Sequence, residues 1–263
     1  MFRSNLLLVI VIVSLAANLS TSVSLLSSNE QKVKLALYCE ALCPTSASFI
    51  INYLYKIIEN GLISIVDLEL SPYGNAKISA NGTIVCQLGE WECMLNTVEA
   101  CAIQTWPSVS DHFPFVYCIE KLAYENKYTE WETCFEKLNL DPKPVADCYG
   151  SGFGYELELQ YAQETKMLQP AHTYVPWGVV DGQPLYDDFT EFISYICKAY
   201  KGSNVPNACL DVSHPIGAPK NAKPRNDECY KDEENAKSRS TLLEIILAIV
   251  ASWMPNVGTA DSM

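Results

Sequence analysis

Basic residues are scarce in this chain of 263 residues. It holds 18 lysines and arginines against 31 aspartates and glutamates, which gives a formal net charge of −13 at pH 7. Proteins that bind nucleic acid neutralise its phosphates with basic patches, so this balance argues against nucleic acid as a partner. An acidic surplus is compatible with a secreted protein or with one that works in an acidic compartment.

Apolar runs long enough to cross a membrane are also missing. A helix that crosses a membrane needs about 20 apolar residues. After Arg3 the sequence has an apolar run of about a dozen residues followed by small residues, which is typical of a secretory signal peptide. We assign residues 1–24 to this signal and expect cleavage between Ala16 and Ser24. We therefore expect the mature protein to enter the secretory pathway, which is an oxidising environment.

The C-terminal region has the composition of a linker and a short tail. Residues 211–240 combine prolines with a charge-dense stretch, a composition that predicts a disordered linker. Leu242–Met254 is apolar, but it is too short to span a membrane and contains Glu244. We expect residues 241–263 to form an amphipathic or disposable tail, with membrane association as the less favoured alternative.

A second active-site thiol is missing where the local pattern would place one. Val33, Leu35 and Leu37 alternate with other residues and predict a short strand, and Pro44 suits the first position of the helix that follows. Cys43 therefore lies where a strand passes into a helix N-terminus, and unpaired N–H groups and the helix dipole favour a thiolate there. A redox turn of this kind normally reads Cys-x-x-Cys.

Ser46 occupies the second position of that motif, and a hydroxyl cannot form a disulfide. Cys39 lies four residues before Cys43 and could supply the second thiol if the two sulfurs reach disulfide geometry. Otherwise an external thiol would release the product, or the protein would only bind thiol partners. We expect Ser46 to cap the helix rather than to bond the Cys43 thiolate. The alternative interpretation makes Cys39 a buried cysteine and Cys43 a framework cysteine.

Eleven cysteines fit an extracellular or secretory compartment. We expect Cys229 to be free or to link a dimer. With Cys39 and Cys43 also set aside, eight candidates remain for structural disulfides: Cys86, Cys93, Cys101, Cys118, Cys134, Cys148, Cys197 and Cys209. Proximity favours two pairs, Cys118–Cys134 and Cys197–Cys209. No paired ligand spacing supports a metal site.

The remaining pattern predicts an α/β domain over residues 30–210. A second strand over residues 63–70 follows the first helix, and a mainly helical block covers about 87–168. Asp181-Gly182 lies between apolar runs and predicts a β-hairpin, which a closing helix follows. This order predicts a thioredoxin-like fold with a cysteine-rich helical insertion. Asn81, in Asn-Gly-Thr, is a predicted glycosylation site.

Periodicity does not explain one dense group of residues, which reads Cys86-Gln87-x-Gly89-x-x-Glu92-Cys93-x-x-Asn96-x-x-x-x-Cys101. This group resembles the signature of the gamma-interferon-inducible lysosomal thiol reductase family. Three flanking stretches resemble the same family: Leu37–Pro44, Pro72–Ala76, and Leu168-Gln169-Pro170 with His172, Tyr174 and Val175-Pro176-Trp177. The resemblance extends over roughly Val33–Cys209.

The resemblance implies a thioredoxin-like fold and reduction of protein disulfides at acidic pH, after delivery to a lysosome-type compartment or secretion. The family's active-site pair falls on Cys43 and position 46, so Ser46 departs from it. Cys39 also departs, because the family usually has an aromatic residue there. Pro176 resembles the cis-proline that such folds place opposite the nucleophile, where it presents backbone to an extended substrate. His172, near the same loop, is expected at the surface.

These features predict a thiol–disulfide oxidoreductase, a protein disulfide reductase with Cys43 as nucleophile and weakened or monothiol chemistry because of Ser46. The predicted partners are disulfide-bonded proteins and a small-molecule thiol reductant, with no cofactor. The predicted location is extracellular or a lysosome- or vacuole-type compartment. The alternative is a non-catalytic, secreted interaction protein that keeps the scaffold.

Overall fold

The computed structural model describes residues 32–210 and 229–230. The predicted signal peptide, the predicted tail and most of the predicted linker lie outside these ranges. Within them, no helix is long and apolar enough to cross a membrane.

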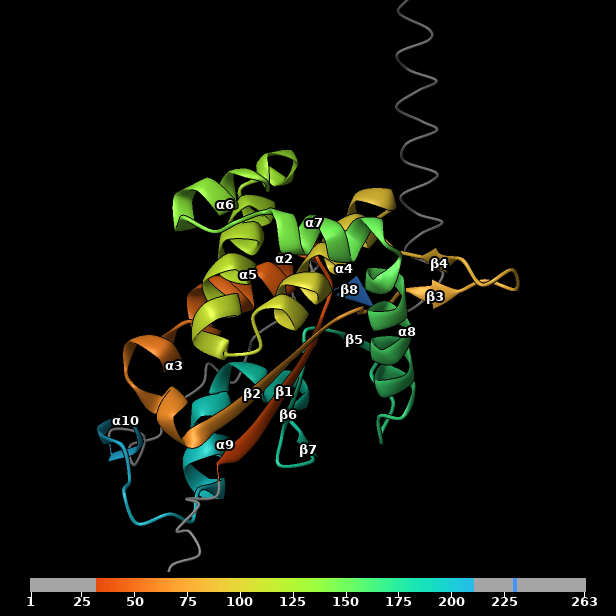
Figure 1. Cartoon of the computed structure of the whole chain (residues 1–263). Helices are drawn as coiled ribbons and strands as arrows, with labels where there is room; N and C mark the ends of the chain where they lie inside the picture. The colour runs from red at the N-terminus through yellow and green to blue at the C-terminus, as the bar shows by residue number, and fades with distance from the viewer. Residues whose placement is uncertain (1–31, 211–228, 231–263) are drawn as a thin grey trace, which may run out of the picture. The chain divides into compact units, whose positions relative to one another are not determined.

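The described elements follow one another in a β-α-β opening, a run of helices and a β-β-α close (Figure 1). The first part contains β1 (Val33–Cys39), α2 (Pro44–Phe49), a π-helical turn (Ile50–Leu54), α3 (Lys56–Glu59), β2 (Val66–Pro72), β3 (Lys77–Ile78) and β4 (Ile84–Val85). The helical block contains α4 (Glu90–Thr105), α5 (Val109–Tyr124), α6 (Thr133–Leu138), α7 (Lys143–Gly150) and α8 (Phe153–Lys166). The last part contains β5 (Tyr174–Val175), β6 (Trp177–Val180), β7 (Gln183–Pro184), α9 (Phe192–Ala199), α10 (Asn207–Leu210) and β8 (Cys229–Tyr230).

The main sheet has four strands in the order β2-β1-β6-β7. Strand β1 pairs parallel with β2 and antiparallel with β6, and β6 pairs antiparallel with β7 around Asp181-Gly182, which confirms the predicted hairpin. This topology is that of a thioredoxin-like fold. Strand β2 begins at Val66 rather than at the predicted residue 63. Gly61 has a φ of +75°, and the chain makes a 3₁₀ turn over Leu62–Ile65 before the strand begins.

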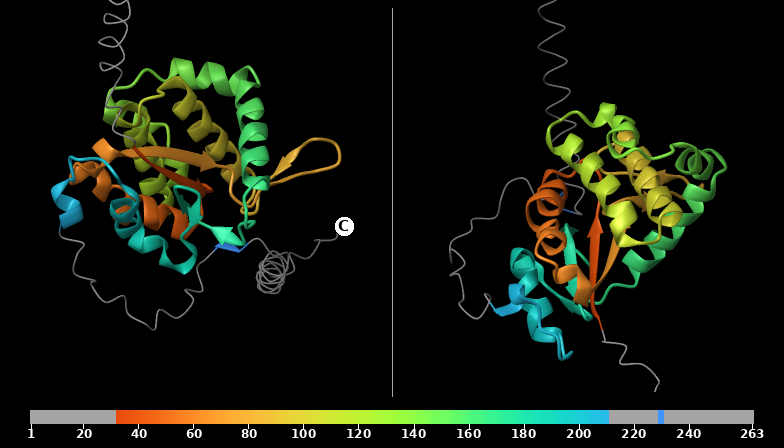
Figure 2. Two further views of the ribbon diagram at one scale, coloured as in Figure 1. Left: turned by 90° about the horizontal axis from the view of Figure 1, so that it is seen from below. Right: turned by 60° about the vertical axis from the view of Figure 1, so that its left-hand side comes forward.

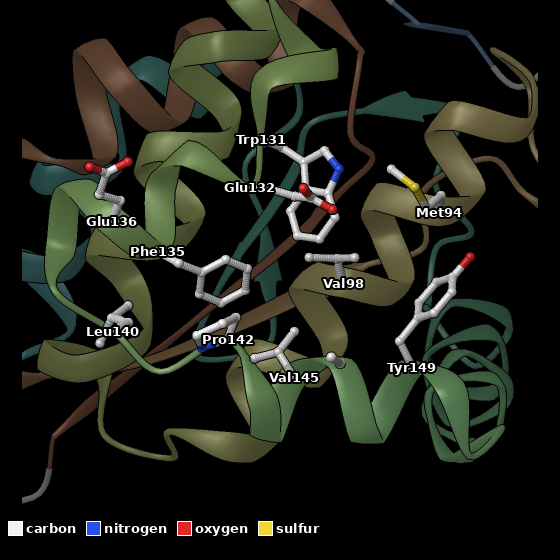
Figure 3. Close-up of a pocket in the computed structure, with 11 residues that line it drawn as sticks. Met94, Val98, Trp131, Glu132, Phe135, Glu136, Leu140, Pro142, Val145 and Tyr149 are labelled. Carbon is white, nitrogen blue, oxygen red and sulfur yellow. The ribbon is translucent and has the colours of Figure 1, made fainter.

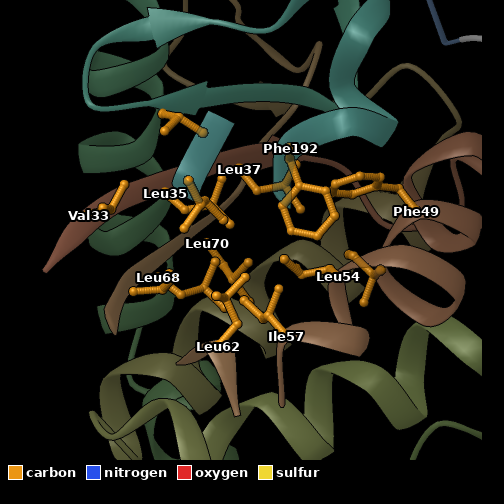
Figure 4. Close-up of a cluster of buried hydrophobic side chains, with 14 of the residues drawn as sticks. Val33, Leu35, Leu37, Phe49, Leu54, Ile57, Leu62, Leu68, Leu70 and Phe192 are labelled. Carbon is orange, nitrogen blue, oxygen red and sulfur yellow. The ribbon is translucent and has the colours of Figure 1, made fainter. Parts of the chain in front are cut away.

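The alternating apolar residues predicted from the sequence form the hydrophobic core on one face of the sheet. Val33, Leu35 and Leu37 of β1 are buried on one face and pack with α2, α3 and α9, including Phe49 and Phe192 (Figure 4). On the other side of the sheet, helices α4 and α8 contact β2, and β1 lies between the two sets of helices (Figure 2). Burial of this apolar surface positions the C-terminal end of β1, where Cys43 follows.

The helical block has its own core and two of the five disulfides. Cys101–Cys148 joins α4 to α7, and Cys118–Cys134 joins α5 to α6, the latter as expected from proximity. Beside this core lies a pocket of about 740 Å³, lined by apolar side chains that include Met94, Val98 and Trp131 (Figure 3). No cysteine lines this pocket, which is therefore separate from the site described below.

Part of the predicted linker is ordered. Residues 229–230 form β8, which pairs antiparallel with β5 and brings Cys229 opposite Val175. The prediction of a disordered linker over 211–240 is therefore wrong for these two residues. The composition of residues 211–240 gave no sign of the Cys43–Cys229 disulfide, which fixes this strand.

Candidate functional site

Cys43 lies at the N-cap of α2, directly before Pro44 at the first helical position. The residue before it, Leu42, has a φ of +68°, and this turn brings the chain from β1 back into the helix. The Cys43 side chain is fully buried, and its Sγ lies 3.8 Å from the carbonyl oxygen of Val175. The strand–helix junction predicted from the sequence is therefore present.

Cys43 is joined to Cys229 by a disulfide that spans 186 residues of sequence, with the two Cα atoms 6.1 Å apart. This corrects the expectation that Cys229 is free or links two chains. Cys229 is itself buried, and its partner in the adjacent strand is Val175, the residue before Pro176. The Val175–Pro176 bond is cis, as the resemblance implied. Strand β8 (Cys229–Tyr230), called the tail strand from here on although it lies in the predicted linker, thus covers Cys43, the candidate nucleophile.

Two side-chain amides hold the main chain of the tail strand. Asn75 Nδ2 donates a hydrogen bond of 2.9 Å to the carbonyl of Cys229, and Gln87 Nε2 donates one of 2.7 Å to the carbonyl of Tyr230. Asn75 Nδ2 also donates to Gln87 Oε1 at 2.7 Å, which orients the two amides toward each other. Both residues belong to motifs that the sequence singled out, but their contact with residues 229–230 follows only from the fold.

Glu40 places a carboxyl group beside this disulfide. One of its oxygens and the sulfurs of Cys43 and Cys229 all lie within 4.8 Å of one another. Its Oε2 accepts a hydrogen bond of 2.7 Å from the backbone N–H of Asn75, and its Oε1 is buried without a hydrogen-bond partner. Burial raises the pKa of Glu40 to about 7, although the bond from Asn75 opposes this change. Glu40 can therefore exchange a proton near neutral pH.

Glu40 belongs to a larger set of buried carboxyl groups that sequence reasoning missed. Burial, together with the nearby charge of Glu40, raises the pKa of Glu92 to about 9 and that of Glu120 to about 8. Burial also raises the pKa values of Glu99 and Glu158 well above their usual range. One signal was available, because Glu92 and Glu99 are seven residues apart and so share the buried face of α4.

Other residues of the cysteine-rich signature organise the loop that carries Cys43. Asn96 Oδ1 accepts a hydrogen bond of 2.8 Å from the backbone N–H of Ala41, two residues before Cys43. Glu92 accepts one from the backbone N–H of Leu88, and Cys86 bonds to Cys93 across the start of α4. The signature therefore connects α4 to the site loop and positions Gln87.

Ser46 does not have the role expected of it, and Cys39 agrees with the alternative interpretation of a buried cysteine rather than with that of a second active-site thiol. Ser46 lies in the first turn rather than at the N-cap, and its buried hydroxyl has no hydrogen-bond partner among the described residues. The predicted capping role is therefore wrong. Cys39, the one free cysteine in the described ranges, packs in the sheet core with its Sγ 3.9 Å from the carbonyl of Ser71. Burial raises the pKa of its thiol well above the usual value, which disfavours the thiolate. His172 is buried, contrary to expectation.

Thiolates and carboxylates can bind a metal ion, and the ligand atoms of Cys43, Cys229 and Glu40 all lie within 4.8 Å of one another. The two sulfurs are bonded to each other, however, and a metal binds thiolates rather than a disulfide. In the oxidised state described here, the group is therefore suited to disulfide exchange.

A thioredoxin-like fold with a disulfide at the start of its first helix defines a thiol–disulfide oxidoreductase. The family model described as gamma interferon inducible lysosomal thiol reductase (GILT) matches residues 34–138. A gamma-interferon-responsive lysosomal thiol protein of Arabidopsis thaliana is 41% identical over 190 residues, which cover 71% of this chain and 79% of the relative. A gamma-interferon-inducible lysosomal thiol reductase of Mus musculus is 31% identical over 186 residues, covering 69% and 73%. The chain belongs to this family.

Among solved structures, the reduced form of the disulfide bond oxidoreductase DsbG from Mycobacterium tuberculosis is similar, with a TM-score of 0.48 and 13% identity. The match covers 73% of this chain and 93% of that chain. The strand order of the main sheet, rather than this likeness, defines the fold. Five disulfides in the described residues are consistent with the secretory pathway.

Proposed function

We propose that this protein reduces disulfides of protein substrates with Cys43 as the nucleophile. One observation carries the proposal: the sulfur of Cys43 is in a disulfide with a short extended strand that pairs with β5. A mixed disulfide between Cys43 and an extended substrate needs the same elements, a free strand edge beside the sulfur and donors for the substrate carbonyls. The β5 edge with Asn75 and Gln87 supplies them.

In the proposed first step, the Cys43 thiolate attacks one sulfur of the substrate disulfide. A Cys43–substrate disulfide forms, the substrate S–S bond breaks, and the other substrate sulfur leaves as a thiolate. Glu40 lies close to the two sulfurs and, when protonated, can donate a proton to the departing thiolate. Pro176 is placed next to the strand edge and keeps Val175 in position to pair with substrate backbone.

We further propose that the protein works in an acidic lysosome- or vacuole-type compartment or outside the cell. The buried carboxyl groups behind Cys43 favour this, because their raised pKa values keep them protonated in an acidic medium. Asn81 is exposed in the turn between β3 and β4, where a glycan could be attached without disturbing the fold.

The test is reduction of insulin by the full-length protein with a small-molecule thiol as reductant, at acidic and at neutral pH. We expect turnover by the wild type and loss of turnover in Cys43→Ser. A Cys43→Ser variant with wild-type activity would rule out the proposed nucleophile. If the wild type itself shows no turnover with any small thiol, the non-catalytic interaction protein becomes the better interpretation.

A further inference from the structure

The tail strand is held at its backbone, its side chains and its sulfur. Asn75 and Gln87 bond the carbonyls of Cys229 and Tyr230, as described above. The ring of Tyr230 meets that of Tyr174 edge-on, with the centroids 5.9 Å apart. Strand pairing with β5 sets the register, so Cys229 is the residue whose sulfur faces Cys43. Two cysteines that met only by chance would not require hydrogen-bond donors placed for the carbonyls of this strand.

The site otherwise has no second thiol among the described residues. The residue in the first turn of α2 is Ser46, whose hydroxyl cannot form a disulfide. Cys39 is a core thiol that points to the Ser71 carbonyl. Eight other cysteines are paired with one another in four bridges. Cys229 is therefore the described cysteine that completes a redox pair with Cys43.

We propose that Cys229 is the resolving thiol of this reductase, delivered to Cys43 by the tail strand in place of a cysteine at position 46. The proposal rests on the proposed function of Cys43. It assigns to residues 229–230 a catalytic role outside the segment that the family model matches, which ends at residue 138.

The proposed cycle balances with a small-molecule thiol as the reductant. After the first step, the Cys229 thiolate attacks Cys43 Sγ in the Cys43–substrate disulfide, the bond to substrate breaks, and the substrate sulfur leaves as a thiolate that takes up a proton. The substrate disulfide has then gained two electrons, and the protein holds the Cys43–Cys229 disulfide seen here. Two molecules of the external thiol reduce this bond and leave as their own disulfide, which restores both protein thiols.

The short length of β8 suits a thiol that must leave and return. The two described residues of the strand are held by contacts that include the pairing with β5, two side-chain hydrogen bonds and one ring contact. Substrate backbone would use the same β5 edge, so the tail withdraws when substrate binds. When the tail returns, its sulfur meets Cys43 in the geometry already observed.

The experiment follows the mixed disulfide in the full-length, reduced protein. The protein is freed of reductant and mixed with an excess of a disulfide-linked peptide, and the products are resolved by mass spectrometry after acid quenching. We expect the wild type to release both peptide thiols and to accumulate the Cys43–Cys229 disulfide. Cys229→Ser should instead accumulate a Cys43–peptide adduct. A thiol tethered to the same chain acts at an effective concentration on the order of millimolar. When external thiol is then added at about 0.1 mM, we expect Cys229→Ser to release the peptide roughly tenfold more slowly than the wild type does.

Two further variants make the test specific. Ser46→Cys combined with Cys229→Ser places a thiol back in the first turn of α2, and we expect it to restore release. Cys39→Ala removes the core thiol, and we expect wild-type release. If Cys39→Ala accumulates the adduct and Cys229→Ser does not, Cys39 is the resolving residue and the proposal is wrong.

Three other outcomes separate this proposal from the proposed function. If Cys43→Ser still reduces the peptide, the nucleophile is misassigned and both ideas fail. If Cys43→Ser is inactive but Cys229→Ser releases peptide as fast as the wild type, Cys43 keeps its role and Cys229 loses the one proposed here. Faster attack by Cys229→Ser with unchanged release would show that the tail only blocks the site.

Discussion

Asn75 donates a hydrogen bond of 2.9 Å to the carbonyl of Cys229, 154 residues further along the chain. It does so while its own backbone N–H bonds Glu40, the carboxyl group beside the Cys43–Cys229 sulfurs. One residue of the Pro-Tyr-Gly-Asn turn therefore fixes both the tail strand and the proton-exchanging group.

Asn75→Ala should make the Cys43–Cys229 disulfide easier to reduce. The substitution removes one hydrogen bond to the docked strand, worth about 0.5–1.5 kcal/mol, so the equilibrium should move roughly two- to tenfold toward the dithiol. Equilibration in glutathione buffers of varied ratio, followed by thiol alkylation and mass analysis, measures this change. Asn52→Ala, at an exposed helical amide, is the control and should leave the equilibrium unchanged. Equal changes in both variants would contradict the assigned contact.

Glu40→Gln should change the pH dependence of Cys43 alkylation in the reduced protein. The wild-type carboxyl has a pKa of about 7, and above that pH its negative charge opposes the nearby thiolate. An amide carries no charge, so we expect the variant to lose the inflection near pH 7 and to react faster than the wild type at pH 8. Mass spectrometry of iodoacetamide labelling in the Cys229→Ser background isolates Cys43. The exposed Glu156→Gln should keep the wild-type profile.

Folding stability should fall as the pH rises from about 5 to 9. The pKa values of Glu40, Glu120 and Glu92 are about 7, 8 and 9 in the folded chain, against 4.5 when unperturbed. Between pH 4.5 and its folded-state pKa, each carboxyl group binds more protons in the folded state than in the unfolded state. Its contribution to stability is complete below pH 4.5 and is lost as the pH rises through its folded-state pKa. A tenfold difference in proton affinity between the two states corresponds to about 1.4 kcal/mol of stability.

Thermal unfolding followed by circular dichroism measures this pH dependence. The melting temperature should be several degrees lower at pH 8 than at pH 5, because these carboxyl groups ionise freely in the unfolded chain but are held protonated by burial in the folded chain. A melting temperature that rises over this range would contradict the assignment.

Gly74→Ala should destabilise the protein more than Gly82→Ala. Both glycines have positive φ, at +58° and +87°, so an alanine at either position costs about 1–2 kcal/mol in the left-handed region. At Gly74 the added Cβ would also overlap the Glu40 side chain, whereas at Gly82 it would meet only the Tyr155 hydroxyl at an ordinary distance of 3.6 Å. Such overpacking costs about 1–3 kcal/mol more. Urea unfolding of both variants measures the difference, and equal midpoints would show that Glu40 moves aside freely.

The sequence was sufficient for the local features that depend on short-range pattern. Alternating apolar residues predicted β1, Pro44 predicted the start of α2, and Asp181-Gly182 predicted the β6–β7 hairpin. These succeed because burial of one strand face and the geometry of a two-residue turn are set by residues adjacent in the chain. Proximity also predicted the two disulfides that close short loops, Cys118–Cys134 and Cys197–Cys209.

The contacts between distant segments required the tertiary structure. Composition indicated a linker around Cys229, yet strand pairing, two amides and a disulfide order residues 229–230 against the site. The polar residues of the cysteine-rich signature were visible, but only the fold shows that Gln87 and Asn75 meet at the tail strand. Spacing places Glu92 and Glu99 on one face of α4, but the burial of that face depends on the packing of α4, α5 and α8 together.

The sequence by itself determined the family, the fold class and the position of Cys43 at the start of α2, because these depend on local pattern and motif. The tertiary structure decided which sulfur faces Cys43. That choice is set by the pairing of β8 with β5, which brings Cys229 to Cys43 across 186 residues of chain and which no local preference encodes.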